Sequence, residues 1–198
     1  MGKWIALGVV LLLVLVLGMC GVGSYNGLVG SSQAVDAQWA QVENVYQRRA
    51  DLIPNLVNTV KGAANFEQET LVKIAEARAS VGKAQINGKE LVNDPQAFAR
   101  FQQAQDALSS ALQHLLVVAE AYPDLKATQA FRDLQAQLEG SENRITVERM
   151  RFNEAAQAYN TKRLSFPTNL LAGMFGFGEK AYFKAQAGAE QAPKVQFQ

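Results

Sequence analysis

The sequence predicts an all-α protein, with an N-terminal transmembrane helix followed by an up-and-down antiparallel bundle of three to four long helices. Three observations predict this class. Residues 4–23 form an uncharged apolar run, hydrophobic residues recur at alternating steps of three and four along much of the remaining chain, and Ala, Gln, Leu and Val are abundant while there are only 5 prolines. The expected segments are a cytoplasmic N-terminus at 1–3, an anchor at 4–23, a juncture at 24–34, a helical bundle at 35–166, and an apolar segment with an extended tail at 167–198.

The composition argues against several classes of function. A formal net charge of +1 and a charged fraction of 19% provide no basic field for binding nucleic acid. The single cysteine, Cys20, excludes an intramolecular disulfide and a paired-cysteine zinc or redox site. The single histidine, His114, lies in an apolar helical stretch, and the sequence has no glycine-rich nucleophile elbow. We therefore expect no enzymatic activity, no cofactor and no bound metal.

The apolar run from Trp4 to Gly23 has the length of a membrane span. About twenty residues at roughly 1.5 Å each cover the roughly 30 Å of a hydrocarbon core. Lys3 precedes the run, and the first charged side chain after it is Asp36. The positive-inside rule then places the N-terminus in the cytoplasm and the bulk of the chain outside it, with Trp4 as an anchor at the membrane interface.

Two alternatives to an uncleaved anchor stay open. The small residues Gly21 and Gly23 fit a cleaved secretory signal. A lipoprotein signal would modify Cys20, although Met19 stands where such signals carry a small residue.

Four helices are expected in the bundle, at about 35–62, 66–85, 95–122 and 126–164. The first carries a heptad seam, which is typical of helices packed nearly parallel or antiparallel, at Val35, Trp39, Val42, Tyr46, Arg49, Ile53, Leu56 and Val60. Pro54 predicts either a kink near 50–51 or the start of a new helix. Short connections make neighbours antiparallel, so the two longest helices should lie side by side.

The other helices have their own caps and inward faces. Asn65 is the expected cap of the second helix, and Asp94 that of the third, with Pro95 at the first helical position. The second helix should turn inward Leu71, Ile74, Arg78 and Val81. The third should turn inward Phe98, Phe101, Gln105, Leu108, Leu112, Leu115, Ala119 and Tyr122. The fourth should turn inward Phe131, Leu134, Leu138, Ile145, Phe152, Ala156 and Tyr159.

Polar residues on and beside the first seam are the candidates for a site. Because a buried guanidinium needs a partner, Arg49 is expected to meet Glu142 or Glu148 on the fourth helix. Three interpretations apply: a polar layer that fixes helix register, a surface for a partner or small ligand, and a catalytic carboxylate pair of Asp51 and Glu142, of which the first is preferred. The candidate residues are Arg48, Arg49, Asp51, Asn55, Asn58, Glu142, Arg149, Asn153 and Asn160.

After Pro167 the chain becomes rich in glycine and apolar residues, in a stretch too short to cross a bilayer. It either folds back on the end of the bundle or contacts the membrane interface or a partner. The candidates for interface contact are Trp4, Leu170, Leu171, Met174, Phe175 and Phe177.

Several sequence blocks resemble the LemA family. They are YNGLV at 25–29, WAQVENVYQRRADLIPNLVNTVKGAANFEQETL at 39–71, ARA at 77–79, LQAQLEGSENRITVERMRFNEAAQAYN at 134–160 and APKVQF at 192–197. The resemblance runs from about Tyr25 to the C-terminus. Some relatives carry a lipoprotein cysteine just before this region, and Cys20 departs from that pattern because Met19 precedes it.

The resemblance implies a bacterial envelope protein anchored in the inner membrane, with a bundle of long helices outside it and no established enzymatic activity. It also implies protein partners such as a membrane metalloprotease and, in magnetic bacteria, an association with magnetosome membranes. We therefore expect a single-pass interaction or scaffold factor that contacts lipid through its anchor, binds envelope proteins and is able to form homo-oligomers. The alternatives are an oligomeric membrane-organising protein and an accessory to a membrane protease.

Overall fold

The computed structural model describes residues 2–62, 66–84 and 88–185, and these form an all-α bundle with no strand among them. The predicted fold class is confirmed. The helices are α1 (Gly2–Lys61), α2 (Gln68–Ala84), α3 (Gly88–Leu91), α4 (Pro95–Ala119), α5 (Pro123–Ala127), α6 (Gln129–Leu164) and α7 (Thr168–Met174).

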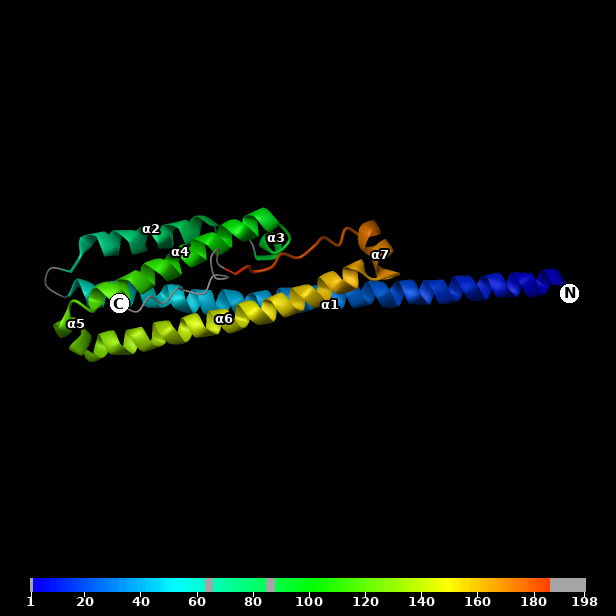
Figure 1. Ribbon diagram of the computed structural model, residues 1–198. Helices are drawn as coiled ribbons and strands as arrows, with labels where there is room; N and C mark the ends of the chain where they lie inside the picture. The colour runs from blue at the N-terminus through cyan, green and yellow to red at the C-terminus, as the bar shows by residue number, and fades with distance from the viewer. Residues whose placement is uncertain (1, 63–65, 85–87, 186–198) are drawn as a thin grey trace, which may run out of the picture.

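The long helices pair in antiparallel fashion. α6 runs back along α1, and α2 lies along α4, which runs in the opposite direction (Figure 1). The prediction that the two longest helices lie side by side is therefore confirmed. The short helices α3 and α5 lie at opposite ends of α4, and α7 lies where α6 ends against α1.

α1 is one continuous helix of 60 residues, so the predicted juncture at 24–34 is wrong as a break. Gly and Ser each cost only up to about 1 kcal/mol in a helix, and packing outweighs that. Leu28 and Val35 are fully buried, and Lys162 of α6 donates a hydrogen bond to the Gly27 carbonyl at 3.0 Å. The helix also continues through Pro54 without restarting.

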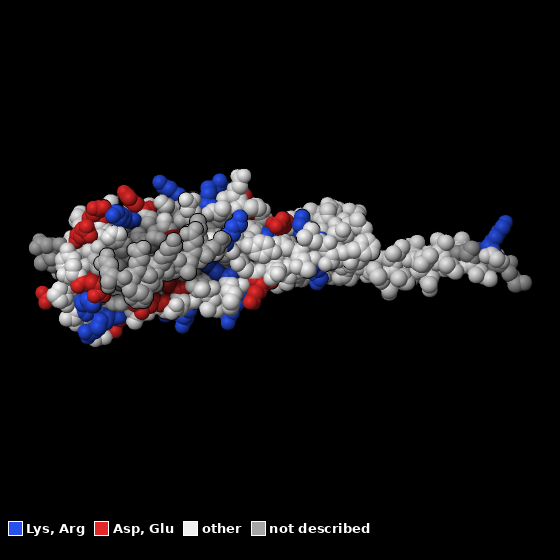
Figure 2. All heavy atoms as spheres, viewed as in Figure 1, with Lys and Arg blue, Asp and Glu red and all other residues white. Residues whose placement is uncertain are grey.

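The first third of α1 projects beyond the bundle as a bare apolar rod (Figures 1 and 2). Figure 2 shows it free of charge except for basic atoms near its tip. Among the described residues, only α1 is long and apolar enough to cross a membrane, judged by length and composition, with a mean hydropathy of 3.0 in its most apolar window. None of that window is buried inside the protein, so nothing in the bundle covers it.

The predicted seam of α1 is buried at every position from Val35 to Val60. Those of α4 and α6 are buried too, except that Tyr122 and Leu134 are only half-buried. Of the four predicted inward residues of α2 only Ile74 is buried, and Arg78 is exposed, contrary to its predicted position. The heptad pattern therefore located the core of three helices, while the shorter α2 buries a narrower face.

Several predicted helix ends differ from the structure. The third helix ends at Ala119 rather than 122, and α5 interrupts the chain before α6 begins at Gln129. Asp94 caps α4 as predicted, because its Oδ1 accepts from the backbone N–H groups of Ala97 and Gln96 and these bonds lower the pKa of its carboxyl. The predicted cap Asn65 and the tail from 186 onward lie outside the described residues.

After α7 the chain returns along the bundle as an extended segment, which we call the return segment (residues 178–185). Ala181 and Phe183 are buried in the core, and the Ala181 N–H donates to the Val92 carbonyl at 3.1 Å. The region beyond Pro167 thus folds back on the bundle, one of its two predicted placements.

Candidate functional site

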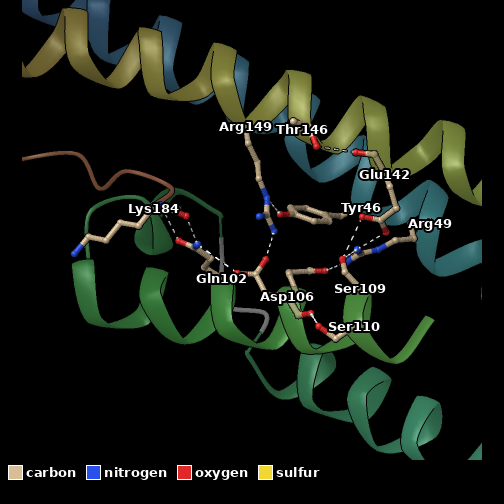
Figure 3. A network of polar contacts seen from close by, with 11 residues as sticks. Tyr46, Arg49, Gln102, Asp106, Ser109, Ser110, Glu142, Thr146, Arg149 and Lys184 are labelled. Atoms are coloured by element: carbon tan, nitrogen blue, oxygen red, sulfur yellow. Dashed lines mark hydrogen bonds and ion pairs between the residues drawn. The ribbon is translucent and has the colours of Figure 1, made fainter. Parts of the chain in front are cut away.

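A layer of buried polar side chains crosses the bundle at Arg49, midway along the packed part of α1 (Figure 3). Arg49 Nη1 donates to Glu142 Oε1 of α6 at 2.8 Å and to Ser109 Oγ of α4 at 2.6 Å. Its Nη2 donates to Gln105 of α4. Ser109 Oγ in turn donates to Glu142 Oε2 at 3.2 Å, so one guanidinium ties three helices together.

A second cation lies beside the first. Arg149 of α6 donates from Nε to the Tyr46 hydroxyl at 2.6 Å and from Nη2 to Asp106 Oδ1 of α4 at 2.8 Å (Figure 3). The guanidinium carbons of Arg49 and Arg149 lie 5.2 Å and 5.6 Å from the centre of the Tyr46 ring, on which both can act as cation–π partners. Burial raises the pKa of the Tyr46 hydroxyl to about 12, so it stays neutral and accepts from Arg149 at physiological pH.

These polar groups lie at the boundary between two hydrophobic clusters. On α1, the cluster nearer the apolar rod ends at Tyr46 and the distal cluster begins at Ile53. On α6 the corresponding limits are Ile145 and Leu138. A sliding of one helix by a turn would place Arg49 against apolar side chains without its partners, at a cost of several kcal/mol. The geometry therefore supports a register-setting polar layer, the preferred interpretation of the sequence.

The polar layer leaves little room for a small ligand, which was one of the alternative interpretations. The cavity beside it, lined by Trp39, Tyr46 and Gln105 among others, measures about 60 Å³. Pockets for small molecules are typically about 300–1,000 Å³. Among the described residues, no group of three or more His, Cys, Asp or Glu side chains is arranged to hold a metal ion.

The other α1 candidates lie outside the layer. Arg48, Asp51, Asn55 and Asn58 are all exposed. Asp51 accepts a hydrogen bond from Gln47 at 2.7 Å, whereas Glu142 is bound to Arg49 and Ser109. The structure therefore does not bring Asp51 and Glu142 together as a carboxylate pair.

Asn153 and Asn160 have a different role from the one the sequence suggested. Each presents its amide to the main chain of the return segment: Asn153 exchanges two hydrogen bonds of 2.9 Å with Phe183, and Asn160 exchanges bonds of 2.9 and 3.0 Å with Lys180. Gln102 of α4 makes the same paired contact with Lys184, at 2.7 and 3.1 Å. Three side-chain amides thus hold an extended backbone much as a neighbouring β-strand would.

Sequence reasoning missed the residues that complete these contacts. Ser109 and Gln102 come from α4 and meet their partners only through tertiary packing. Lys180 was not among the candidate residues, yet its side chain is buried, with Nζ 3.6 Å from Asp36 Oδ1 and 5.6 Å from the centre of the Tyr159 ring. The signals available in the sequence were the two-turn spacing of Asn153 and Asn160 and the seam position of Gln105.

Of the residues predicted to contact the membrane interface, some are partly packed against the bundle and the others are exposed. The Tyr25 ring of α1 packs edge-on against Phe175 and Phe177, with ring centres 5.0 Å and 5.7 Å apart. Phe177 and Leu171 are half-buried, whereas the other four predicted interface residues are exposed: Trp4, Leu170, Met174 and Phe175.

The sequence model of the LemA family matches residues 38–197, a span that includes the polar layer, the amide contacts and α7. The chain belongs to the LemA family. The resemblance seen in the sequence blocks is thereby confirmed.

Curated relatives are distant in sequence. The chain is 25% identical to magnetosome protein MamQ 2 of Paramagnetospirillum magneticum over 84% of this chain and 66% of that protein. It is 25% identical to magnetosome protein MamQ of Magnetospirillum gryphiswaldense over 80% of this chain and 64% of that protein. It is 24% identical to protein LemA of Metamycoplasma hominis over 83% of this chain and 70% of that protein. The chain thus spans about two thirds of the length of the MamQ relatives.

Proposed function

We propose that this LemA-family protein is a non-enzymatic, single-pass membrane protein that acts as an interaction or scaffold factor in the bacterial cell envelope. The observation that carries this proposal is the continuity of α1, whose apolar part and bundle part form one 60-residue helix. A partner bound to the bundle is then held at a set height above the membrane, because a continuous helix is far stiffer than a flexible linker.

The proposed location is the inner membrane, with the bundle on the extracytoplasmic side. The support is the asymmetry of charge around the apolar run, with Lys3 before it and no charged side chain after it until Asp36. Labelling single cysteines at Lys3 and at Asn58 in intact cells, in a Cys20→Ser background, tests this orientation. Labelling of position 58 but not of position 3 by a membrane-impermeant reagent is expected, and the reverse result would overturn it.

The proposed partner surface is an exposed polar stripe on α1, which lies off the buried seam. Its members recur at helical steps of three and four residues: Gln41, Asn44, Arg48, Asp51, Asn55 and Asn58. Apart from Arg48 and Asp51 they are uncharged amides, which form hydrogen bonds without the desolvation cost of buried charges. Such a stripe suits reversible contact with a second polar protein surface.

A photo-crosslinking residue placed at Asn55 of the full chain in native membranes tests this surface, with Gln113 on the exposed side of α4 as the control position. The expected result is a defined crosslinked protein at position 55 that weakens when Arg48 is replaced by Ala and is missing at position 113. Equal crosslinking at both positions would contradict the assignment. A membrane protease as the captured protein would identify the role as that of a protease accessory.

A membrane-organising role in an oligomer is the second candidate, and the exposed apolar surface around α7 favours it. Copies anchored in one membrane meet at high effective concentration, so weak lateral contacts are enough for assembly. The test is the size distribution of the full chain in vesicles at increasing protein-to-lipid ratio, by crosslinking. A monomer at every ratio would contradict this second role while leaving the scaffold proposal intact.

A further inference from the structure

The end of the bundle nearest the apolar rod carries a cluster of exposed apolar side chains, which we call the α7 surface. Its members, Leu164, Phe166, Leu170, Met174 and Phe175, are each 58–81% exposed. Thr168 and Ala172 of α7 are buried against the bundle, so the helix is fixed by one side and shows the other. Such a concentration of large apolar groups marks a contact surface in a folded protein.

α7 lies beside α1 at the point where the apolar rod leaves the bundle (Figure 1). Tyr25, whose ring contacts Phe175 and Phe177, follows Val22 by three residues, and Val22 is the last large apolar residue of the rod that is exposed. Three residues of helix cover about 5 Å. If the rod fills the hydrocarbon core, Tyr25 and α7 lie at the depth of the lipid headgroups, where Tyr is favoured.

The chain around α7 carries basic but no acidic residues. Between Glu154 and Glu179 the only charged residues are Lys162 and Arg163, and α1 has no acidic residue before Asp36. Lys162 Nζ donates to the Gly27 carbonyl at 3.0 Å, and Arg163 Nε donates to the Phe177 carbonyl at 2.8 Å, so both cations are held next to α7. Basic groups flanking an apolar surface are the arrangement that binds an anionic lipid headgroup layer.

We propose that the α7 surface is a second membrane contact, inserted into the headgroup region of the same bilayer that the rod crosses. The occupant is a lipid surface, because the α7 surface continues the lipid-facing surface of α1 and lacks acidic side chains. This inference rests on the proposed anchoring of α1. Its consequence is that two contacts, one spanning and one interfacial, fix the tilt and rotation of the bundle over the membrane.

The test uses nitroxide labels on single cysteines in the full chain, in a Cys20→Ser background, reconstituted in vesicles of phosphatidylethanolamine and phosphatidylglycerol. The reporters are Met174→Cys and Leu170→Cys, both at exposed positions where a label replaces a side chain that is not packed in the bundle. Val117→Cys is the matched control, since Val117 is an equally exposed apolar residue on α4, away from α7. Val14→Cys, within the rod, reports insertion of the anchor itself.

The expected result is that collision with dissolved oxygen exceeds collision with a water-soluble nickel chelate by several-fold at positions 174, 170 and 14, and the reverse at position 117. Aqueous behaviour at 174 and 170 with lipid behaviour at 14 would overturn the interfacial contact while leaving the anchor in place. Aqueous behaviour at 14 would instead contradict the anchoring. Protection of 174 and 170 from both reagents, as a bound protein or second copy would cause, would also overturn a lipid contact.

Discussion

Arg49 and Glu142 form an ion pair of 2.8 Å between α1 and α6, in which the arginine side chain is 1% exposed and the glutamate side chain 31%. The pair is asymmetric: the cation depends wholly on protein partners, while the carboxylate keeps some contact with water. Ser109 and Gln105 supply the remaining partners of the guanidinium. The ion pair thus contributes more to specifying how α1 and α6 align than to net stability.

Replacing Arg49 by Ala is expected to destabilise the protein by about 3 kcal/mol, because Glu142, Gln105 and Ser109 lose their common donor and a cavity forms. For a chain of this size that is a fall in Tm of roughly 6–12 °C. Thermal unfolding of the full chain in detergent, followed by circular dichroism, measures it. The neighbouring exposed residue gives a matched control: Arg48→Ala should change stability by less than about 0.5 kcal/mol. Equal effects of both substitutions would refute the polar layer.

The raised pKa of the Tyr46 hydroxyl predicts a loss of stability in strong alkali. Its pKa is about 12 in the folded protein because of burial, against about 10 when unfolded. The stability that this raised pKa represents is therefore fully present below pH 10 and is lost as the pH rises from about 10 to about 12, by about 3 kcal/mol in all. The free energy of unfolding, measured with denaturant across this pH range, should fall less steeply for Tyr46→Phe than for the unsubstituted chain. Parallel declines for the two proteins would contradict the assignment.

Asn153 holds the return segment through its paired hydrogen bonds with Phe183. Asn153→Ala leaves a backbone donor and acceptor unpaired, which costs about 1–3 kcal/mol. Hydrogen exchange at residues 180–184 should therefore quicken by roughly ten-fold or more, while exchange in α1 and α2 changes little. The exposed Asn55→Ala variant is the control. Unchanged exchange at Phe183 in the Asn153 variant would show that the amide is not what holds the segment.

Two glycines provide opposite expectations for the same substitution. Gly140 lies within α6, and a β-carbon added there would meet nothing within 4 Å apart from its chain neighbours and the backbone of its own helix, so Gly140→Ala should stabilise the helix by about 0.5–1 kcal/mol. At Gly88 an added β-carbon would overlap Trp39 Nε1 and Glu43 Oε1, so Gly88→Ala should destabilise the protein by about 1–3 kcal/mol through overpacking. The expected result is a rise in Tm for Gly140→Ala and a fall in Tm for Gly88→Ala. A stabilised Gly88 variant would mean that Trp39 has room to move.

The sequence by itself determined the long helices and the buried faces of α1, α4 and α6. Buried positions of a helix recur every three to four residues, and the seam positions of α1 from Val35 to Val60 follow that rule and are all buried. It also predicted that Arg49, a cation on an apolar seam, needs a carboxylate partner on the long antiparallel helix, with Glu142 as one of two choices. It did not predict helix through 24–34, because glycine and serine lower local propensity while the stabilising contacts, from Leu28 and Lys162, are tertiary.

Tertiary structure alone decided the choice of Glu142 over Glu148, since the register of α1 against α6 depends on the packing of both clusters at once. It also decided that Gln105 and Ser109 of α4 complete the layer, and that Asn153, Asn160 and Gln102 hold main chain rather than each other. A periodic pattern specifies which face of a helix is buried. Which side chain meets which across an interface depends on distances between segments far apart in the chain, and those exist only once the bundle has assembled.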